Sequence, residues 1–185
     1  PSRQAETIEL ISEEEIMAKS TFSGPVKSLA GFISAGVNNS VSLTADTTLT
    51  VADHAGKILL CNDADGKFTL PSINISVPTD ATDPNQANNI GASFYFVIET
   101  AATDLDILTD GTDKFEGAVM VAVDNGAKKA FVPAATNDVM TMNGSTKGGI
   151  AGSVVKVTAI DAVTYLVHDS LLIGSGTIVT PFADA

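Results

Sequence analysis

Residues 41–70 read VSLTADTTLTVADHAGKILLCNDADGKFTL, and this stretch decides the fold class. From Val41 to Val51 the odd positions are mostly apolar and the even positions are serine, threonine or aspartate. This period of two predicts a β-strand with one buried face. Lys57–Cys61 predicts a short buried strand, and Lys67–Leu70 predicts a further alternating strand after another turn. Strand, turn, strand, turn, strand predicts an antiparallel meander.

The composition favours sheet over helix in one folded domain. The chain has 185 residues, of which 44% are apolar, so a substantial core can form. Charged residues make up only 17%, and 20 threonines stand against 10 lysines and arginines. Because β-branched side chains fit a pleated surface, this balance predicts β-structure.

The charge and the cysteine content exclude several classes of protein. A net charge of −12 without a cluster of basic residues argues against binding to nucleic acid or to an anionic membrane. No apolar run approaches the roughly 20 residues of a membrane span, and the acidic N-terminus does not resemble a signal peptide. We therefore expect a soluble protein made in a cytoplasm. Cys61, the one cysteine, excludes an internal disulfide framework and is predicted to be a small buried core residue.

Residues 1–40 differ from the rest and are expected to form an N-terminal arm. Ser12 and Glu15 have the spacing of a capping box, and Ile11 with Ile16 has that of a hydrophobic staple. They predict a short helix near residues 13–19. A helix of this length needs a surface to lie on, either its own domain or another subunit.

Residues 20–40 place isolated apolar side chains between small residues and glycines. This pattern favours an extended arm whose apolar side chains dock into pockets, and the alternative is an irregular loop packed on its own sheet. The expected anchors of the arm in a capsid or subunit interface, together with those of the helix, are Ile11, Ile16, Phe22, Val26, Leu29, Phe32 and Ile33.

Residues 41–185 are predicted to form the β-domain, with about ten short strands separated by turn signals. Ala92–Ile98 is apolar at nearly every position and predicts a central strand covered on both sides. Gly117–Val123 and Lys128–Val132 flank an Asn-Gly turn, and Val155–Val167 predicts a second hairpin. The expected fold is all-β: an antiparallel β-sandwich or jelly-roll-like barrel, with the extended N-terminal arm and one short N-terminal helix.

Residues with catalytic or metal-binding chemistry are few. The two histidines, His54 and His168, do not make an ordinary zinc site with one cysteine. A Ser-His-Asp triad would need one of them, and Gly174-Ser175-Gly176 lacks the full nucleophile-elbow pattern. Residues 63–66 resemble part of a calcium loop but lack its first and last ligands, so a hairpin turn is the expected structure. We expect no catalytic residue, no metal ligand and no cofactor.

Four aspartates leave one alternative open. Asp104 and Asp106 share a face of a predicted strand, and Asp110-Gly111 would turn the chain back towards them, with Asp113 close behind. They form either a weak cation site or a solvated acidic edge that blocks pairing between sheets.

The order of these short motifs resembles a β-module of tailed-bacteriophage virion proteins. A strand with the pattern GK-apolar-Asn leads to a strand that ends in proline, then come a polar loop, an aromatic strand and a terminal hairpin carrying Tyr165. The entry to the arm is similar to the start of small marine-phage structural proteins. The matching runs are TFSGPVKS (21–28), SLTADTTLT (42–50), HAGKILLCN (54–62), GKFTLP (66–71), GASFYFV (91–97) and residues 155–167.

The resemblance implies a non-enzymatic capsid decoration, or cement, protein on the virion surface. Its partners would be the major capsid protein and further copies of itself, with a trimer as the expected form. The alternative is a tail or head-fibre component that recognises a host surface glycan through threonine and asparagine loops. An enzyme is the third alternative and would depend on His54 or His168.

Overall fold

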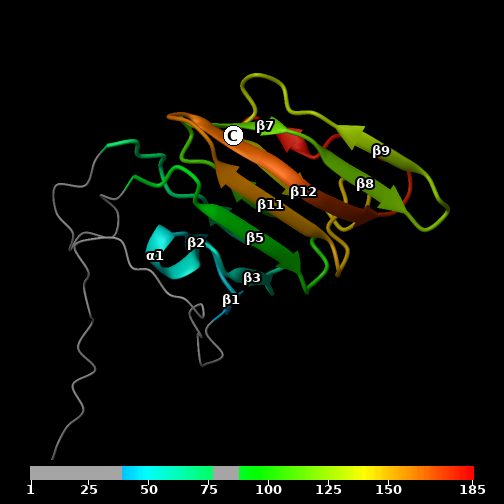
Figure 1. Cartoon of the computed structure of the whole chain (residues 1–185). Coiled ribbons are helices and arrows are strands. Elements are labelled where there is room, and N and C mark those ends of the chain that lie inside the picture. The colour runs from blue at the N-terminus through cyan, green and yellow to red at the C-terminus, as the bar shows by residue number, and fades with distance from the viewer. Residues whose placement is uncertain (1–38, 77–87) are drawn as a thin grey trace, which may run out of the picture. The chain divides into compact units, whose positions relative to one another are not determined.

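The computed structural model describes residues 39–76 and 88–185, and these residues form two β-sheets (Figure 1). Side chains of both sheets fill one apolar core, where the rings of Phe68 and Phe96 stack with centroids 6.4 Å apart. The strand order of the described residues leaves both sheets open, so the architecture is a sandwich and not a barrel. The predicted all-β sandwich is confirmed, and its sheets mix parallel with antiparallel pairs.

The large sheet contains eight strands. They are β1 Ser40–Leu43, β3 Ile58–Cys61, β5 Ser93–Ile98, β7 Lys114–Gly117, β8 Val119–Val123, β9 Lys128–Phe131, β11 Val154–Ala159 and β12 Thr164–Gly174. Their order is β1-β3-β5-β11-β12-β8-β9, and β7 also pairs with β12. Figure 1 shows β5, β11, β12, β8 and β9 lying side by side.

The small sheet contains five strands, and one helical turn lies outside both sheets. The strands are β2 Thr47–Thr48, β4 Lys67–Thr69, β6 Leu105–Leu108, β10 Val139–Met142 and β13 Phe182–Ala183, in the order β13-β10-β6-β4-β2. The helix α1 spans Val51–His54 and is capped by Thr50, whose hydroxyl accepts a hydrogen bond from the Asp53 amide at 3.2 Å.

The antiparallel meander predicted for residues 41–70 is wrong. Consecutive strands from β1 to β6 alternate between the two sheets, so that neighbours within one sheet run parallel: β1 with β3 and β5, and β2 with β4 and β6. The predicted strand Val41–Val51 is divided into β1, β2 and the start of α1. Alternation of apolar residues reports which face of a strand is buried, but it does not report which strand is its partner.

Strand pairing in the small sheet, parallel between β4 and β6 and antiparallel between β6 and β10, places apolar side chains in a ladder that crosses the core. Phe68 of β4 pairs with Ile107 of β6, which pairs with Met140 of β10, and all three side chains are fully buried. Tyr165 of β12 is also buried, and its hydroxyl donates a 2.6 Å hydrogen bond to the carbonyl of Pro71. This bond ties the segment after β4 to a strand 94 residues further along the chain.

Other predicted strands are confirmed. β5 lies between β3 and β11, as expected for the central strand, and β8 pairs antiparallel with β9 across the Asn125-Gly126 turn. β11 and β12 form the second hairpin. The apolar stretch Gly117–Val123, expected to be one strand, holds the last residue of β7 and the whole of β8, which begins at Val119.

Candidate functional site

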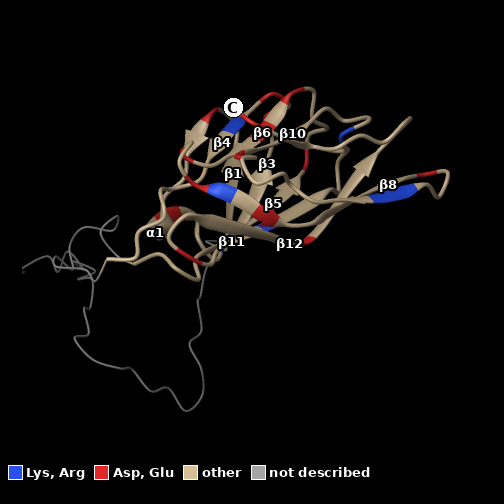
Figure 2. Ribbon diagram, turned by 90° about the horizontal axis from the view of Figure 1, so that it is seen from above, with Lys and Arg blue, Asp and Glu red and all other residues tan. Residues whose placement is uncertain are grey.

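The surface of the described residues is acidic, with few basic groups. In Figure 2, lysine and arginine occupy a few short, separate segments of the coloured ribbon, between acidic and uncharged ones. This distribution agrees with the net charge of −12. Binding of a polyanion by counterion release would require a cluster of lysine and arginine.

One face of the central strand β5 lacks the cover that its sequence predicts. Phe94, Phe96 and Ile98 are fully buried in the core, whereas Ser93, Tyr95 and Val97 on the other face are only half-buried. The prediction that both faces are covered is therefore wrong for the described residues. The outer face of the large sheet is a surface on which side chains of several strands come together.

A row of apolar side chains crosses this outer face from β3 to β8. The register pairs Leu60 with Val97, Val97 with Val154, Val154 with Leu171, and Leu171 with Met120. Leu171 and Met120 are each 43% exposed, and the other three are half-buried. Paired residues on neighbouring strands lie about 5 Å apart, so the five side chains form one continuous stripe, which we name the apolar row.

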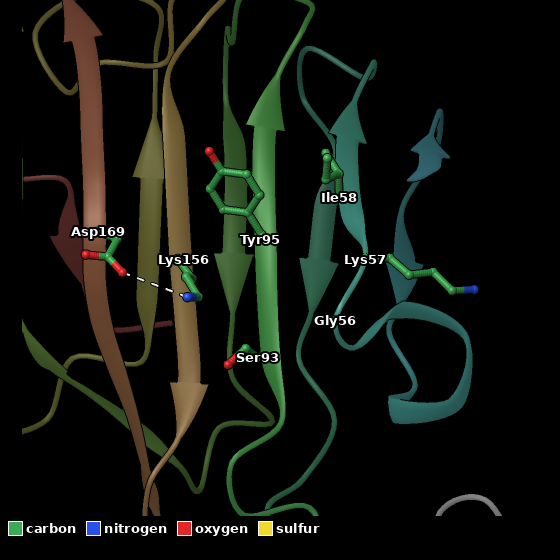
Figure 3. A pocket seen from close by; sticks show the side chains of 7 residues that line it. All are labelled: Gly56, Lys57, Ile58, Ser93, Tyr95, Lys156 and Asp169. Atoms are coloured by element: carbon green, nitrogen blue, oxygen red, sulfur yellow. Dashed lines mark ion pairs between the residues drawn. The ribbon is translucent and has the colours of Figure 1, made fainter. Parts of the chain in front are cut away.

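The next row along the same strands borders a shallow groove of about 510 Å³. Tyr95 lies at its centre, with Ile58 of β3 on one side and Lys156 of β11 on the other (Figure 3). Ser93, Asp169 and the turn residues Gly56 and Lys57 complete its wall. Figure 3 shows the Lys57 side chain directed away from Tyr95. We name this site the Tyr95 groove.

A chain of hydrogen bonds runs beside the groove across three strands. His168 lies with Nδ1 3.0 Å from the Asp169 carboxylate and with Nε2 2.8 Å from the Thr158 hydroxyl. The Thr158 hydroxyl lies 2.7 Å from that of Ser93. Four side chains from β5, β11 and β12 therefore hold one another in fixed orientations.

A β-bulge in β12 gives Asp169 its position. Val154 pairs with Leu171 but Lys156 pairs with His168, so two residues of β12 stand opposite one residue of β11. Asp169 has a φ of 48°, the one positive value at a non-glycine residue in the described ranges. Aspartate tolerates this left-handed conformation better than most residues. The carboxylate comes to 3.8 Å from the Lys156 ammonium, as the dashed line in Figure 3 marks.

The order Asp169, His168, Thr158 is that of a nucleophile-activating triad. The geometry indicates instead that these hydrogen bonds hold the side chains in place and do not activate Thr158. The Asp169 side chain is 74% exposed, whereas the triad aspartate is buried to hold the imidazole in one tautomer. The Thr158 hydroxyl lies between His168 and Ser93, so a substrate carbonyl would have to compete with Ser93 for it. The other histidine, His54, accepts a 2.9 Å hydrogen bond from the Thr50 amide within α1.

The four aspartates considered as a cation site belong to two separate places. Asp104 and Asp106 line a shallow groove on the small sheet with Lys67, which pairs with Asp106. Asp110 and Asp113 lie beyond the other end of β6, in the connection to β7 of the large sheet. Within the described residues, no cluster of three or more acidic, histidine or cysteine side chains could hold a metal ion.

Asp110 and Asp113 serve the connection between β6 and β7. Burial pushes the pKa of Asp110 upward, but hydrogen bonds involving Ser72, Asp113 and Thr112 outweigh it and lower this pKa to about 2. Burial raises the pKa of Asp113, whose carboxylate accepts a 2.9 Å hydrogen bond from the Ile73 amide. Both carboxylates therefore have roles in the fold.

Cys61 is buried in the core, as predicted. Burial, with a contribution from Glu99, raises the pKa of the thiol to about 12. A thiol with so high a pKa is a poor nucleophile near neutral pH. The loop at residues 63–66, expected to be a hairpin turn, instead joins β3 of the large sheet to β4 of the small sheet.

The sequence-predicted interface lies outside the described residues. This holds for the helix near residues 13–19, for most of the arm over residues 1–40, and for all of its anchors. The anchors are Ile11, Ile16, Phe22, Val26, Leu29, Phe32 and Ile33.

The residues of the Tyr95 groove were not predicted as a site. The alternation within Ala92–Ile98 already put Ser93, Tyr95 and Val97 on one face. Lys156 and Thr158 shared a face in the same way. What the sequence lacked was the register that brings these two faces together.

Comparison with known proteins gives no relative from which a function could be transferred. No protein-family model, curated protein or solved structure matches this chain. Within the described residues, no helix has the length and hydrophobicity needed to cross a membrane. The function must therefore be argued from the geometry of the outer face of the large sheet.

Proposed function

We propose that this chain is a non-enzymatic virion protein that decorates and stabilises the outer surface of a bacteriophage capsid. In this proposal its partners are the major capsid protein and further copies of itself, and it acts on the virion surface. The arm supplies apolar anchors such as Phe22 and Phe32, and the apolar row supplies a second contact. The resemblance of the β-module to virion proteins motivates the choice of a capsid as the partner.

The apolar row is the observation that carries the proposal. The described residues leave this row partly exposed, and large exposed apolar patches on soluble proteins often belong to protein interfaces. The row extends over β3, β5, β11, β12 and β8, so its backbone is already paired in the sheet. Covering five half-exposed side chains of this kind stabilises a complex by on the order of 5 kcal/mol before the cost of association.

Binding to the assembled shell would stabilise that shell by mass action. A ligand that binds only the assembled form raises its stability in proportion to the logarithm of the ligand concentration. The low fraction of charged residues and the high threonine content suit a protein that binds other proteins and does not catalyse a reaction. The net charge of −12 keeps the free protein soluble before it meets the shell.

The test measures binding to empty capsids by co-sedimentation. It compares the unmodified full chain with one truncated and two substituted forms. Deleting residues 1–36 is expected to abolish binding while the β-domain stays folded. The pair of substitutions Met120→Lys and Leu171→Lys is expected to weaken binding at least tenfold, because each buries a charge in the interface. Ile160→Lys is the matched control, since Ile160 is 41% exposed but lies outside the row.

Two outcomes contradict the proposal. Saturation of the shells by the truncated chain would remove the role of the arm. Equal binding by the Met120→Lys, Leu171→Lys protein and the Ile160→Lys control would remove the role of the apolar row. Circular dichroism and thermal unfolding of each form establish that a loss of binding is not a loss of fold.

A further inference from the structure

The Tyr95 groove has the composition of a ligand site and is distinct from the apolar row. Its volume of about 510 Å³ falls within the range of small-molecule sites. It combines one aromatic ring, one aliphatic side chain, a carboxylate, a hydroxyl and two ammonium groups, of which that of Lys57 is directed away from Tyr95 (Figure 3). The apolar row, one step further along the strands, has no charged member.

The polar groups of the groove can form further hydrogen bonds. Lys156 Nζ and Asp169 Oδ2 lie 3.8 Å apart, too far for a direct hydrogen bond. Their side chains are 35% and 74% exposed, so both present free bonding capacity to a ligand. Two neighbouring hydroxyl groups could bridge them, one accepting from the ammonium and the other donating to the carboxylate.

The groove is held in shape by contacts that a ligand would leave intact. The hydrogen bonds from Asp169 through His168 and Thr158 reach Ser93 in the wall of the groove. The bulge fixes Asp169 in a left-handed conformation that places its carboxylate beside Lys156. A non-glycine residue held at positive φ is a local cost that often accompanies function. Such a preformed site loses little entropy when it binds.

Charge and shape restrict the class of ligand. A phosphate or sulfate group beside Lys156 would also face the Asp169 carboxylate 3.8 Å away, and the second lysine of the wall, Lys57, is directed away from Tyr95 (Figure 3). A long apolar ligand would expose most of its surface, because the groove is shallow. A pyranose ring has both an apolar face for an aromatic side chain and vicinal hydroxyls for charged groups.

We propose that the Tyr95 groove binds a neutral sugar residue, with the ring packed on Tyr95 and its hydroxyls bonded to Lys156, Asp169 and Ser93. Glycan recognition was expected above, as the alternative function, in threonine and asparagine loops. The geometry assigns it to the outer face of the large sheet instead. This inference does not depend on attachment to a capsid, since the groove uses a separate row of side chains.

The first measurement is tyrosine fluorescence of the full chain during titration with sugars. The chain has two tyrosines and no tryptophan, and Tyr165 is buried. A ligand that packs on Tyr95 therefore changes the tyrosine emission, and the change is retained in a Tyr165→Phe protein. The probes are methyl glucoside, methyl mannoside and methyl galactoside, with inorganic phosphate as the anionic comparison.

The second measurement is binding to an array that carries glucose-, mannose- and galactose-terminated oligosaccharides together with sialylated and sulfated glycans. The intact chain is expected to bind neutral glycans. Tyr95→Ala and Asp169→Asn are each expected to weaken binding about tenfold or more, while Tyr95→Phe keeps the ring and most of the affinity. Ile160→Ala is the matched control, because Ile160 is 41% exposed and lies outside both the groove and the apolar row, and this variant should bind as the unmodified chain does.

Three results would overturn the inference. In the first, the chain binds no neutral glycan. In the second, it binds only sialylated or sulfated glycans. In the third, Tyr95→Ala binds neutral glycans as strongly as the unmodified chain. Thermal unfolding of every variant separates a lost site from a lost fold. Capsid binding by the same variants is measured separately, so failure of the sugar site and failure of capsid attachment give different results.

Discussion

Asp110 holds the connection between β6 and β7 through a single carboxylate oxygen. Its Oδ1 accepts hydrogen bonds from the Thr112 amide at 2.9 Å, the Thr112 hydroxyl at 2.7 Å and the Asp113 amide at 3.0 Å. A side-chain hydrogen bond with Ser72, together with these three donors, favours the ionised form, which explains why the pKa falls to about 2 despite the opposing effect of burial. The charge of this residue is therefore linked to the stability of the fold.

Replacing Asp110 by Asn tests that linkage, because the amide oxygen can keep the same acceptor position without the charge. A carboxyl whose pKa is depressed on folding stabilises the protein above its unfolded pKa, and that stability is lost as pH falls through the folded pKa. At pH 7 we expect Asp110→Asn to lower the free energy of unfolding by about 1 kcal/mol, discounted because Asp110 is largely exposed. Urea unfolding at several pH values should show this difference shrinking between pH 3.8 and about 2.

Thr112→Val supplies the matched variant, since it removes one donor and keeps the carboxylate. The pKa of Asp110 should rise in this variant, so its pH-dependent loss of stability should still begin near pH 3.8 but should be smaller and end at a higher pH than that of the unmodified chain. Parallel stability curves for the unmodified chain and Asp110→Asn from pH 4 to pH 2 would refute the linkage.

At the scale of elements, β12 organises much of the large sheet. Its first half pairs with β7, its second half pairs with β8, and its other edge pairs with β11. The chain passes from β7 to β8 at Gly117, which has a φ of 98°. A Cβ atom at Gly117 would lie 2.1 Å from the Val167 carbonyl oxygen of β12. Only glycine allows the two strands to follow one another along this partner.

Gly117→Ala should therefore destabilise the sandwich strongly. The left-handed backbone and the clash with main-chain atoms of β12 act together, and we expect a loss of about 3 kcal/mol in the free energy of unfolding. Gly126→Ala is the control, because Gly126 has a φ of 84° but nothing lies within 4 Å of its added Cβ. It should cost only about 1 kcal/mol. Equal losses in the free energy of unfolding for the two variants, measured with denaturant, would show that the clash with β12 does not add to the cost of the left-handed backbone.

At the scale of the whole molecule, charge and the apolar row act in opposite directions. Each chain carries a net charge of −12, so copies repel one another. In our proposal, the apolar row and the anchors of the arm favour association. At 0.1 M salt, repulsion between exposed charges more than about 10 Å apart is largely screened. The free energy gained by burying apolar surface changes little at moderate salt.

The expected trimer should therefore be favoured by salt. Light scattering of the full chain is expected to give a mass near three times the 19.0 kDa of one chain, with the trimeric fraction rising between about 0.05 and 0.5 M sodium chloride. Met120→Lys with Leu171→Lys tests whether the apolar row contributes to this association. A mass of one chain under all salt conditions would contradict the expected oligomer, although capsid binding by a monomer would remain open to the sedimentation test.

The sequence predicted local properties well because they depend on neighbouring residues. Alternation identified most strands and the buried face of β11, and Asn125-Gly126 predicted the hairpin between β8 and β9 because glycine accepts its φ of 84°. Burial of Cys61 followed from its apolar surroundings. The sequence did not predict that the outer face of β5 is left uncovered by the described residues.

By itself, the sequence determined an acidic all-β chain and the face on which each side chain of a strand lies. The tertiary structure alone decided which faces meet. Leu60, Val97, Val154, Leu171 and Met120 form one row, and Tyr95 meets Lys156, only through the strand register. The physical reason is that a strand completes its hydrogen bonds with partners that are distant in sequence, and its own side chains do not identify those partners.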